Sequence, residues 1–550
     1  MKYLFNYILF GLILVSLQAC SSNSRELSAE ELQISQQLRS RFEKMEYLAY
    51  HQDTLLASVD VLNYYKENNF EPVWTKKSGL NASGREMYEL IDNSRDYGLV
   101  PGMFHDQLLR KAKDTALLDA EILLTNAFFL FTTHVNAGCI DPQTKQYVWK
   151  RDSLNFDLFT ELNRVIEGKS VKAIIESHQP NFKEYRQLQS GLSQFIDEYP
   201  LDTTHYSIPP FKEDSVACYA KAYEALIGHA FIDSTVSKQD SAFLVQLKYF
   251  QRRNGLKDDA IVGRWTSNAL EKSNMDRFYQ AALSLEKWRW KKEYPEEYIR
   301  VNIPEFTLYY VDSGEVKRTH RVIVGAYTTQ TPEFHASLKQ IVTNPFWHVP
   351  YSIASTEILY GVRKDSAYFE KKGFKLFKDG EQINPIEINW NDISQNSFSY
   401  KVRQDAGGGN SLGRVKFLFP NSDFIFIHDT PGKYLFNNDV RAYSHGCVRL
   451  EHPFDLAKTI LQKDSDRFPP DTVDSMVTRG GQRVIELNHP FEVYLEYFTA
   501  TADSSGKVIF HPDIYGRDET YIENTYKQFS PYSHSTAKSE KATEVAENAR

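Results

Sequence analysis

The spacing of apolar residues divides the chain into a helical part followed by a strand-rich part. Between residues 28 and 215, apolar side chains recur every three or four positions, most clearly over 108–122 and 123–135. This period is typical of helices with one buried face. Proline and glycine interrupt the pattern at Pro72, Gly98 and Pro101-Gly102. We therefore predict a helical domain over residues 28–215.

The strand-rich part begins at Tyr298. Residues 298–303 lean to alternation, and Asp312-Ser313-Gly314 has the composition of a hairpin turn. Further strands are expected at 339–343, 416–418, 424–428, 482–487, 493–499 and 507–510, with one clear helix at about 453–461. The polar stretch 352–412 contains three consecutive glycines and is predicted to be an insertion or lid.

A small helical unit is expected between these two parts, followed by a connecting helix over 276–297. Gly255 and Gly263 stand where its helices would end. Phe250-Gln251, Gly255-Leu256, Asp258-Asp259 and Gly263-Arg264-Trp265-Thr266 resemble the small peptidoglycan-binding module of cell-wall hydrolases, with Ala260 in place of the usual glycine. We predict this module at 240–272. Whether it binds glycan or only spaces the domains stays open.

Composition and charge narrow the class of protein. The 550 residues are 41% hydrophobic and 25% charged, which excludes a disordered or coiled-coil chain and allows about three or four domains. Lys and Arg number 64 against 72 Asp and Glu, for a net charge of −8. A nucleic-acid partner is therefore not expected, because such surfaces need a basic excess. Histidines and cysteines show no metal-ligand spacing, so no metal is predicted.

The N-terminal residues indicate export. Residues 1–19 combine one lysine with an apolar run of about 14 residues, too short for a membrane span but suited to a signal peptide. Leu17-Gln18-Ala19-Cys20 resembles a bacterial lipobox, which predicts lipidation at Cys20 and a tether over 20–27. We expect a periplasmic lipoprotein of the cell envelope, anchored to the inner or the outer membrane. An ordinary cleaved signal is the alternative. Residues 534–550 are polar and predicted to be disordered.

The strongest chemical signal lies between residues 424 and 457. An apolar strand places His428 at its end, and Cys447 follows 19 residues later in Ser444-His445-Gly446-Cys447-Val448-Arg449. A nucleophilic cysteine needs a base or a cation nearby, because the thiolate is the reactive form. His428 or His445 supplies the base and Arg449 the cation. Nothing around Cys139 or Cys218 indicates reactivity.

This combination closely resembles the L,D-transpeptidase catalytic domain over about residues 298–518. Matching pieces are Val301–Pro304, Val322–Gly325, Thr331-Pro332 and Asn344–Pro350. Pro72–Trp74, Tyr97–Leu99 and Gly138–Pro142 match, more loosely, the scaffold of the large periplasmic branch. The resemblance implies a multidomain α+β protein with a helical scaffold domain, the small helical module and a β-sandwich-like catalytic domain that uses no cofactor.

The resemblance also implies a reaction. Cys447 would attack the third residue of a tetrapeptide stem, and the diamino-acid amine of another stem would resolve the thioester into a 3→3 cross-link. His428 would be the base, since a rigid strand orients it better than the loop orients His445. The Gly446 and Cys447 amides would form the oxyanion hole, and Arg449 would hold a carboxylate. Trp347 would line the donor groove under the 352–412 lid.

Ser444, His445 and Asp429 are expected to support these groups. Asp429, or its carbonyl, would fix the tautomer of His428. Other interpretations stay open: a carboxypeptidase or cysteine peptidase that uses water as acceptor, a catalytically silent wall-binding lipoprotein, or an enzyme that attaches proteins to the wall or exchanges D-amino acids.

Overall fold

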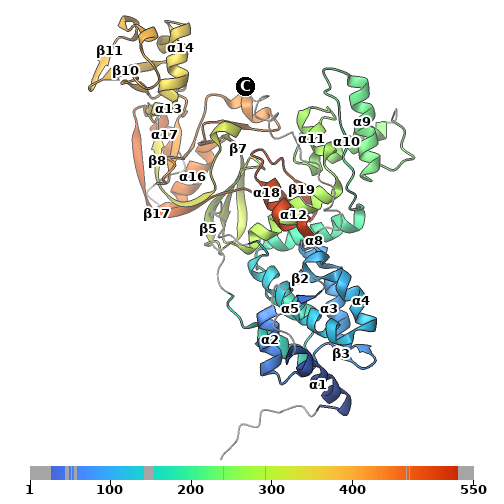
Figure 1. Ribbon diagram of the computed structural model, residues 1–550. Coiled ribbons are helices and arrows are strands. Elements are labelled where there is room, and N and C mark those ends of the chain that lie inside the picture. The colour runs from blue at the N-terminus through green and yellow to red at the C-terminus, as the bar shows by residue number, and fades with distance from the viewer. Residues whose placement is uncertain are drawn as a thin grey trace, which may run out of the picture. The chain divides into compact units, whose positions relative to one another are not determined.

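The structure is a computed structural model that describes residues 27–43, 49–50, 53–54, 58–140, 154–238, 241–291, 293–465, 468–469 and 471–529 (Figure 1). The predicted signal peptide, Cys20 and the predicted disordered tail lie outside these residues. The described residues form two compact units: one lies within Met1–Glu89, Gln107–Leu130 and Leu158–Val171, and the other lies within Leu90–Asp106, Phe131–Asp157 and Lys172–Arg550. No helix in the described ranges is long and apolar enough to cross a membrane.

The first unit is mainly helical, as the apolar spacing predicts. Its principal elements are α1 (Ala29–Glu43), α2 (Ser58–Glu67), α3 (Ala82–Asp92), α4 (Asp106–Thr115), α5 (Leu117–Ala137), α6 (Leu158–Ile166) and the hairpin of β3 (Thr75–Lys76) and β4 (Gly79–Leu80); α3 and α5 continue into the second unit. The helical spacing over 108–122 falls on two helices, α4 and α5. Two helices meet at Ala116, whose carbonyl accepts from the Asp119 and Ala120 amides and so opens a new first turn.

Glu121 on α5 fixes the hairpin segment from inside the first unit. Its carboxylate is fully buried and accepts hydrogen bonds from the Val73 amide (2.5 Å), the Trp74 amide (3.0 Å), the Thr75 hydroxyl (2.7 Å) and the Tyr65 hydroxyl (2.8 Å). Burial raises the pKa of Glu121, and these hydrogen bonds oppose the rise. The expected scaffold motif Pro72–Trp74 is therefore the segment that a buried carboxylate organises.

The second unit contains a central buried helix, α12 (Asn274–Arg289). Ser273 and Asp276 cap its first turn through a reciprocal capping box. The Gln280 amide donates to the carbonyls of Thr499 (2.6 Å) and His511 (2.7 Å), which joins this helix to the C-terminal β-hairpin. The connecting helix thus ends at Arg289, and the expected extension to residue 297 is wrong.

Two scaffold motifs pack against α12. Gly98 and Gly138 have φ of +65° and +85°, and a Cβ on Gly138 would lie 2.3 Å from Glu286 Oε1. The same carboxylate accepts from the Ile140 amide at 2.8 Å. Only glycine combines this backbone conformation with so close an approach. Other helices of the unit are α7 (Val171–Ser177, whose first residue belongs to the first unit), α8 (Lys183–Glu198) and α18 (Asp518–Thr525).

The small helical unit consists of α9 (Ser215–Gly228), α10 (Ser241–Arg253) and α11 (Arg264–Glu271). Gly255 follows α10 with φ of +63°, as expected, but Gly263 precedes the first residue of α11 instead of ending a helix. Gln251 is buried; its amide accepts from Ala260 N (2.8 Å) and donates to Ile261 O (3.0 Å). The Phe-Gln motif therefore has a structural task. Ala260 has φ of +62°, which explains why glycine suits this position.

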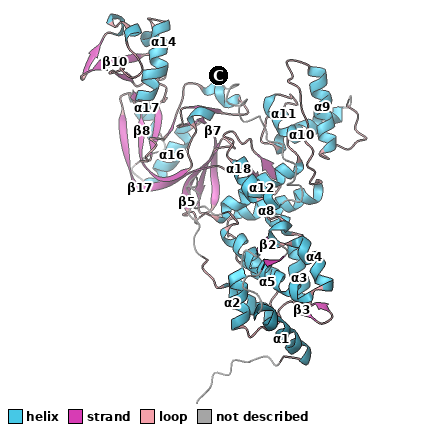
Figure 2. Cartoon of the chain, viewed as in Figure 1, coloured by secondary structure: helices cyan, strands magenta, loops and turns pink. Residues whose placement is uncertain are grey.

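The strand-rich part forms a mixed sheet, whose strands are magenta in Figure 2. Its nine strands follow the order β15-β7-β16-β14-β13-β8-β17-β5-β6, and β7 also pairs with β6. The sheet therefore closes on itself, where a sandwich would have two separate sheets. Its strands are β5 (Glu297–Asn302), β6 (Thr307–Asp312), β7 (Glu315–Gly325), β8 (Phe334–Thr343), β13 (Val415–Leu418), β14 (Ile427–His428), β15 (Ala442–Ser444), β16 (Val448–Leu450) and β17 (Arg483–Glu496). A hairpin of β18 (Ala500–Ala502) and β19 (Val508–Phe510) follows.

Several expectations for this part need correction. The strands predicted at 482–487 and 493–499 are one strand, β17, whose register against β8 shifts between Glu486 and Phe491. The helix predicted at 453–461 is α16 (Pro453–Asp464), but α17 (Thr472–Arg479) accompanies it in the same hydrophobic core. The turn at Ser313-Gly314 is confirmed, with φ of +55° and +73°. A multidomain α+β chain with a helical N-terminal region and a β-rich domain is confirmed.

The polar stretch 352–412 folds around a core of its own. Its elements are α13 (Tyr351–Ile353), the π-helical turn η4 (Ala354–Ile358), α14 (Leu359–Lys364), α15 (Tyr368–Lys372), β10 (Phe374–Lys378), β11 (Glu381–Ile383) and β12 (Lys401–Gln404). With β9 (Trp347–His348), the strands make a sheet in the order β11-β10-β12-β9. Leu376, Trp390 and Phe398 are among its buried side chains. The insertion is a small subdomain.

We expect Glu121→Ala to destabilise the first unit by about 3 kcal/mol or more, because several buried donors would lose their acceptor. The calorimetric unfolding transition of the full chain that reports this unit should move to lower temperature. Glu67→Ala, at an exposed position of α2, is the control and should leave the transition unchanged. Equal shifts for both variants would contradict the role given to Glu121.

Candidate active site

Strand register brings the predicted site residues together. In the parallel pair β14–β16, His428 lies opposite Arg449. In the antiparallel pair β13–β14, Lys416 lies opposite His428. Paired residues on neighbouring strands point to the same face of a sheet. Lys416, His428 and Arg449 therefore form a row across three strands, and Cys447 stands two residues before Arg449, on the same face.

The ring of His428 is held by a backbone carbonyl. Its Nδ1 lies 2.5 Å from the carbonyl oxygen of Asp429, so Nδ1 carries the proton and Nε2 is left as the basic nitrogen. The Asp429 carboxylate serves other partners: the amides of Arg414 (2.9 Å) and Thr430 (2.8 Å) and the ammonium of Lys433 (2.6 Å). Of the two alternatives for Asp429, the geometry favours its carbonyl.

The thiol and the imidazole are both neutral at physiological pH. Burial, with the charges of Arg449 and Lys416, lowers the pKa of His428 to about 3, against backbone hydrogen bonds to Asp429 and Leu412. Burial raises the pKa of Cys447 to about 11, although the Phe426 amide, Arg449 and Lys416 each lower it. A standing thiolate–imidazolium pair is therefore disfavoured.

Hydrogen bonds fix the loop that carries Cys447. The Ser444 hydroxyl donates to the Cys447 carbonyl (2.5 Å) and accepts from the Gly446 amide (3.1 Å). The buried Thr331 hydroxyl donates to the Gly446 carbonyl at 2.7 Å and accepts from the Gly325 amide at 2.8 Å. Gly446 has φ of +107°, a conformation that favours glycine. These contacts set the direction of the thiol.

His445 is paired with a residue outside this cluster. Its Nε2 is paired with the carboxylate of Glu357, on η4 of the insertion. Both side chains are exposed, and neither belongs to the Lys416–His428–Arg449 row. The contact connects the loop before Cys447 to the inserted subdomain. His428 and His445 therefore have different surroundings, as the choice of His428 for the base requires.

Trp347 lies on β9, in the sheet of the insertion. It is half-buried, with its ring centroid 6.0 Å from that of Phe374 on β10. The structure thus brings together Cys447, His428, Arg449, Ser444, Gly446 and the Asp429 carbonyl, and it places His445 and Trp347 against the insertion. Cys139 and Cys218 form no disulfide, and burial raises the pKa of both thiols.

Three residues of this region were not predicted from the sequence as site residues: Lys416, Thr331 and Glu357. Lys416 is the one charged residue in the run Val415–Phe419, and this isolation is a usable signal. Thr331 is visible only as part of the Thr331-Pro332 motif. Glu357 has no signal, because its partner is 88 positions away in sequence.

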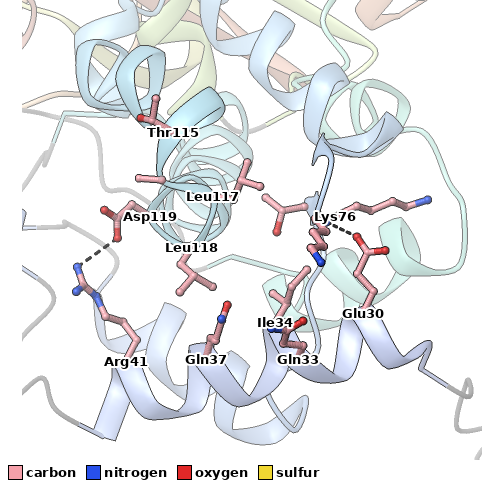
Figure 3. Close-up of a pocket in the computed structure, with 13 residues that line it drawn as sticks. Glu30, Gln33, Ile34, Gln37, Arg41, Lys76, Thr115, Leu117, Leu118 and Asp119 are labelled. Carbon is pink, nitrogen blue, oxygen red and sulfur yellow. Dashed lines mark hydrogen bonds and ion pairs between the residues drawn. The ribbon is translucent and has the colours of Figure 1, made fainter.

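A cavity of about 470 Å³ in the first unit contains none of the predicted site residues (Figure 3). Glu30, Gln33, Ile34, Gln37 and Arg41 of α1 line one side of it, and residues 115–119 line another, with an ion pair of 3.2 Å between Arg41 and Asp119. The described residues contain no group of three histidine, cysteine or acidic side chains placed to hold a metal ion.

The raised pKa of Cys447 predicts how its alkylation depends on pH. Only the thiolate reacts, so the rate of iodoacetamide labelling should rise about tenfold for each pH unit from 7 to about 10, with no plateau near 8.5, the ordinary value for a free thiol. Peptide mapping isolates the Cys447 signal from the two other thiols. A plateau at or below pH 8.5 would mean that the cations outweigh burial.

Comparison with known proteins agrees with this geometry. Residues 296–477 match the family model of the L,D-transpeptidase catalytic domain, and residues 59–192 match that of the scaffold domain. A Haemophilus influenzae protein named "Putative L,D-transpeptidase" is 35% identical over 221 residues, which cover 40% of this chain and 44% of that protein. The match thus spans less than half of the relative's length.

A match to a solved structure, the Ldtfm–avibactam carbamoyl enzyme, is 12% identical and covers 37% of this chain and 49% of that chain, with a TM-score of 0.18. That likeness is too weak to support a conclusion. The two family models match separate parts of one chain, in the order that the sequence motifs predict. Residues 59–192 of this chain are therefore similar to the scaffold domain, and residues 296–477 are similar to the L,D-transpeptidase catalytic domain.

Proposed function

We propose that the protein is a peptidoglycan L,D-transpeptidase, which joins two stem peptides by a 3→3 cross-link through a cysteine acyl-enzyme. The single observation that carries the proposal is the sheet register, which sets His428 beside Arg449 and two residues from the level of Cys447. These three residues come from the two segments that the family motif names, and they lie inside the matched catalytic domain.

In the first half-reaction the Cys447 sulfur attacks the carbonyl carbon of the third stem residue. Nε2 of His428 takes the thiol proton as the carbon–sulfur bond forms, while the Asp429 carbonyl keeps Nδ1 protonated. The carbonyl oxygen becomes an oxyanion next to the Cys447 amide. His428 then gives its proton to the nitrogen of the terminal D-alanine, and the carbon–nitrogen bond breaks. D-Alanine departs, and the stem peptide stays on Cys447 as a thioester.

In the second half-reaction the side-chain amine of another stem attacks the thioester. His428 takes the amine proton, the new amide forms, and the thiol is regenerated when the proton returns to sulfur. Water in place of the amine would give a carboxypeptidase with the same acyl-enzyme. The Gly446 amide donates to the Ser444 hydroxyl, so it joins the oxyanion hole only when this loop shifts.

The inserted subdomain is the proposed cap of the donor groove. Its independent core allows it to act as one body, and the Glu357–His445 contact attaches it to the loop of Cys447. Trp347, on the strand that leads into it, would face the bound peptide.

For the N-terminus we propose a lipid on Cys20 and a location in the cell envelope, with the small helical module directed at peptidoglycan. Cys20 directly follows the lipobox-like sequence and a short apolar run. Several acyl chains would hold the protein on a membrane stably.

Product analysis tests the function. Protein lacking residues 1–27 is incubated with disaccharide-tetrapeptides, and the products are read by mass spectrometry. A cross-linked dimer that has lost one D-alanine is the expected product. Tripeptide alone would assign the carboxypeptidase, and unchanged substrate would assign the silent wall-binding alternative.

Single substitutions test the roles. Cys447→Ala should abolish the acyl-enzyme, whereas Cys139→Ser and Cys218→Ser should keep it.

His428→Ala should slow acylation by about 10²–10⁴-fold, the usual contribution of a positioned base. His445→Ala should lose less, because its partner is Glu357. The assignment of the base is reversed if His445→Ala removes the titrating group and His428→Ala keeps a normal pH profile. Thermal melts check that each variant folds.

The lipid anchor is tested by Cys20→Ser in cells. The variant should move from the membrane fraction to the soluble fraction, because it cannot be acylated. Metabolic labelling with a fatty-acid analogue should mark the unsubstituted protein alone. Equal membrane partitioning of both proteins would argue for an ordinary signal peptide.

A further inference from the structure

Two cations bracket the proposed catalytic base. Lys416 on β13 and Arg449 on β16 occupy the two register positions beside His428. The Lys416 ammonium lies 5.1 Å from the ring centroid of Phe426, whose ring is 5.5 Å from that of His428. One face of the sheet thus carries an ammonium, an imidazole and a guanidinium side by side on three neighbouring strands, next to the thiol of Cys447.

No acidic side chain balances these charges in the described part of the chain. Neither Lys416 nor Arg449 takes part in an ion pair there. The carboxylates close to these residues in sequence are paired with other cations: Glu451, two positions after Arg449, with Arg321, and Asp429, next to His428, with Lys433. Glu357 of the insertion is paired with His445. The groups that face Lys416 are the ring of Phe426, His428 and Cys447, with Arg449 across the row and the apolar Val342 opposite it on β8.

Charges that are partly removed from water are costly unless an opposite charge meets them. Burial accordingly lowers the pKa of Lys416, while Cys447 opposes the shift. Burial likewise lowers the pKa of Arg449. An uncompensated pair of cations at a reaction centre indicates that the anion comes with the ligand.

The proposed reaction places a carboxylate at this point. The nitrogen that leaves must face His428, which protonates it, and in a tetrapeptide this nitrogen belongs to the terminal D-alanine. Its carboxylate is separated from that nitrogen by one carbon atom. When the reacting carbonyl is at Cys447 and the leaving nitrogen at His428, the carboxylate is brought to the flanks of His428, where the cations are.

We propose that Lys416 is a specificity-determining residue of the site, which together with Arg449 binds the terminal carboxylate of the donor stem and so selects tetrapeptide donors. This inference rests on the proposed function. A pentapeptide carries its carboxylate one residue farther from the reacting bond, and a C-terminal amide carries no charge, so both lose this contact. The bound carboxylate also offsets the two positive charges beside His428, which strengthens the base when the correct donor is present.

The first test compares donors. Acyl-enzyme formation at Cys447 is timed by intact-mass spectrometry with a disaccharide-tetrapeptide and with its C-terminal amide. Lys416→Met should lower kcat/KM for the carboxylate donor by about tenfold or more, the usual effect of losing a charge-assisted contact, and change the amide donor by less than about threefold. Lys416→Arg should restore part of the preference.

Lys339→Met is the matched control. Lys339 is an exposed residue of β8 in the same sheet, and its loss should leave the donor preference unchanged. Equal losses for both donors in Lys416→Met would overturn the proposal, because the lysine would then act on the thiol or on the fold. An unchanged preference would overturn it as well.

The second test needs no stem peptide. Anionic iodoacetate and neutral iodoacetamide alkylate the same thiol, so the ratio of their rates at Cys447 reports the anion affinity of its surroundings. Lys416→Met should lower this ratio severalfold, and Lys416→Gln should lower it to the same extent. Lys339→Met should leave the ratio unchanged. If the ratio falls but no muropeptide acylates the wild-type protein, the anion site stands and the transpeptidase proposal fails. A ratio that Lys416→Met leaves unchanged rejects the site.

Discussion

The parallel pairing of β14 with β16 is the constraint on which the site depends. Parallel strands need a crossover connection, and here the segment between His428 and Val448 supplies it. This segment carries the turn after the histidine and the loop before the cysteine. Since pairing sets His428 opposite Arg449, the base and the cation have no freedom to separate. Cys447 stands immediately before β16, and its direction is set by Ser444 and Thr331. Cys447 is therefore held in position as firmly as a strand residue, although it lies in a loop.

Outside the sheet, too, a few polar contacts position backbone segments. The glycines of two scaffold motifs allow backbone to approach α12, and the Glu286 carboxylate there accepts from the Ile140 amide. A third motif is organised by Glu121. Buried carboxylates that satisfy backbone amides position loops without a large apolar face. The scaffold motifs in the sequence therefore mark residues that hold backbone segments in place. Gln251 of the small module has the same role, since it bonds to the backbone of Ala260 and Ile261.

The sequence predicts the helical region and the β-rich domain correctly, because local patterns such as helical spacing encode them. The proposed site residues also come from local patterns, a strand-end histidine and a glycine beside the cysteine. Sequence reasoning could not find Lys416 as a neighbour of His428, since this needs the register of β13. Nor could it find Glu357, which is close to His445 only after the insertion folds. The sequence predicts two strands where the structure has β17. Asn488, His489 and Pro490 lie between the two predicted strands, and the pairing with β8 resumes beyond them after a register shift.

Electrostatics then connects the fold to the chemistry. Burial keeps the Cys447 thiol and the His428 imidazole neutral, and both flanking cations oppose protonation of the imidazole. The cations also favour the thiolate, so their effect on the pair is divided: they help the nucleophile and weaken the base. In the proposed reaction, the donor carboxylate between the two cations would reverse the effect on the base, and the bound substrate would displace water from the thiol. A site of this kind would have low reactivity until a ligand binds that supplies a negative charge. Such control by the substrate would protect the proposed nucleophile from reaction with other acyl groups.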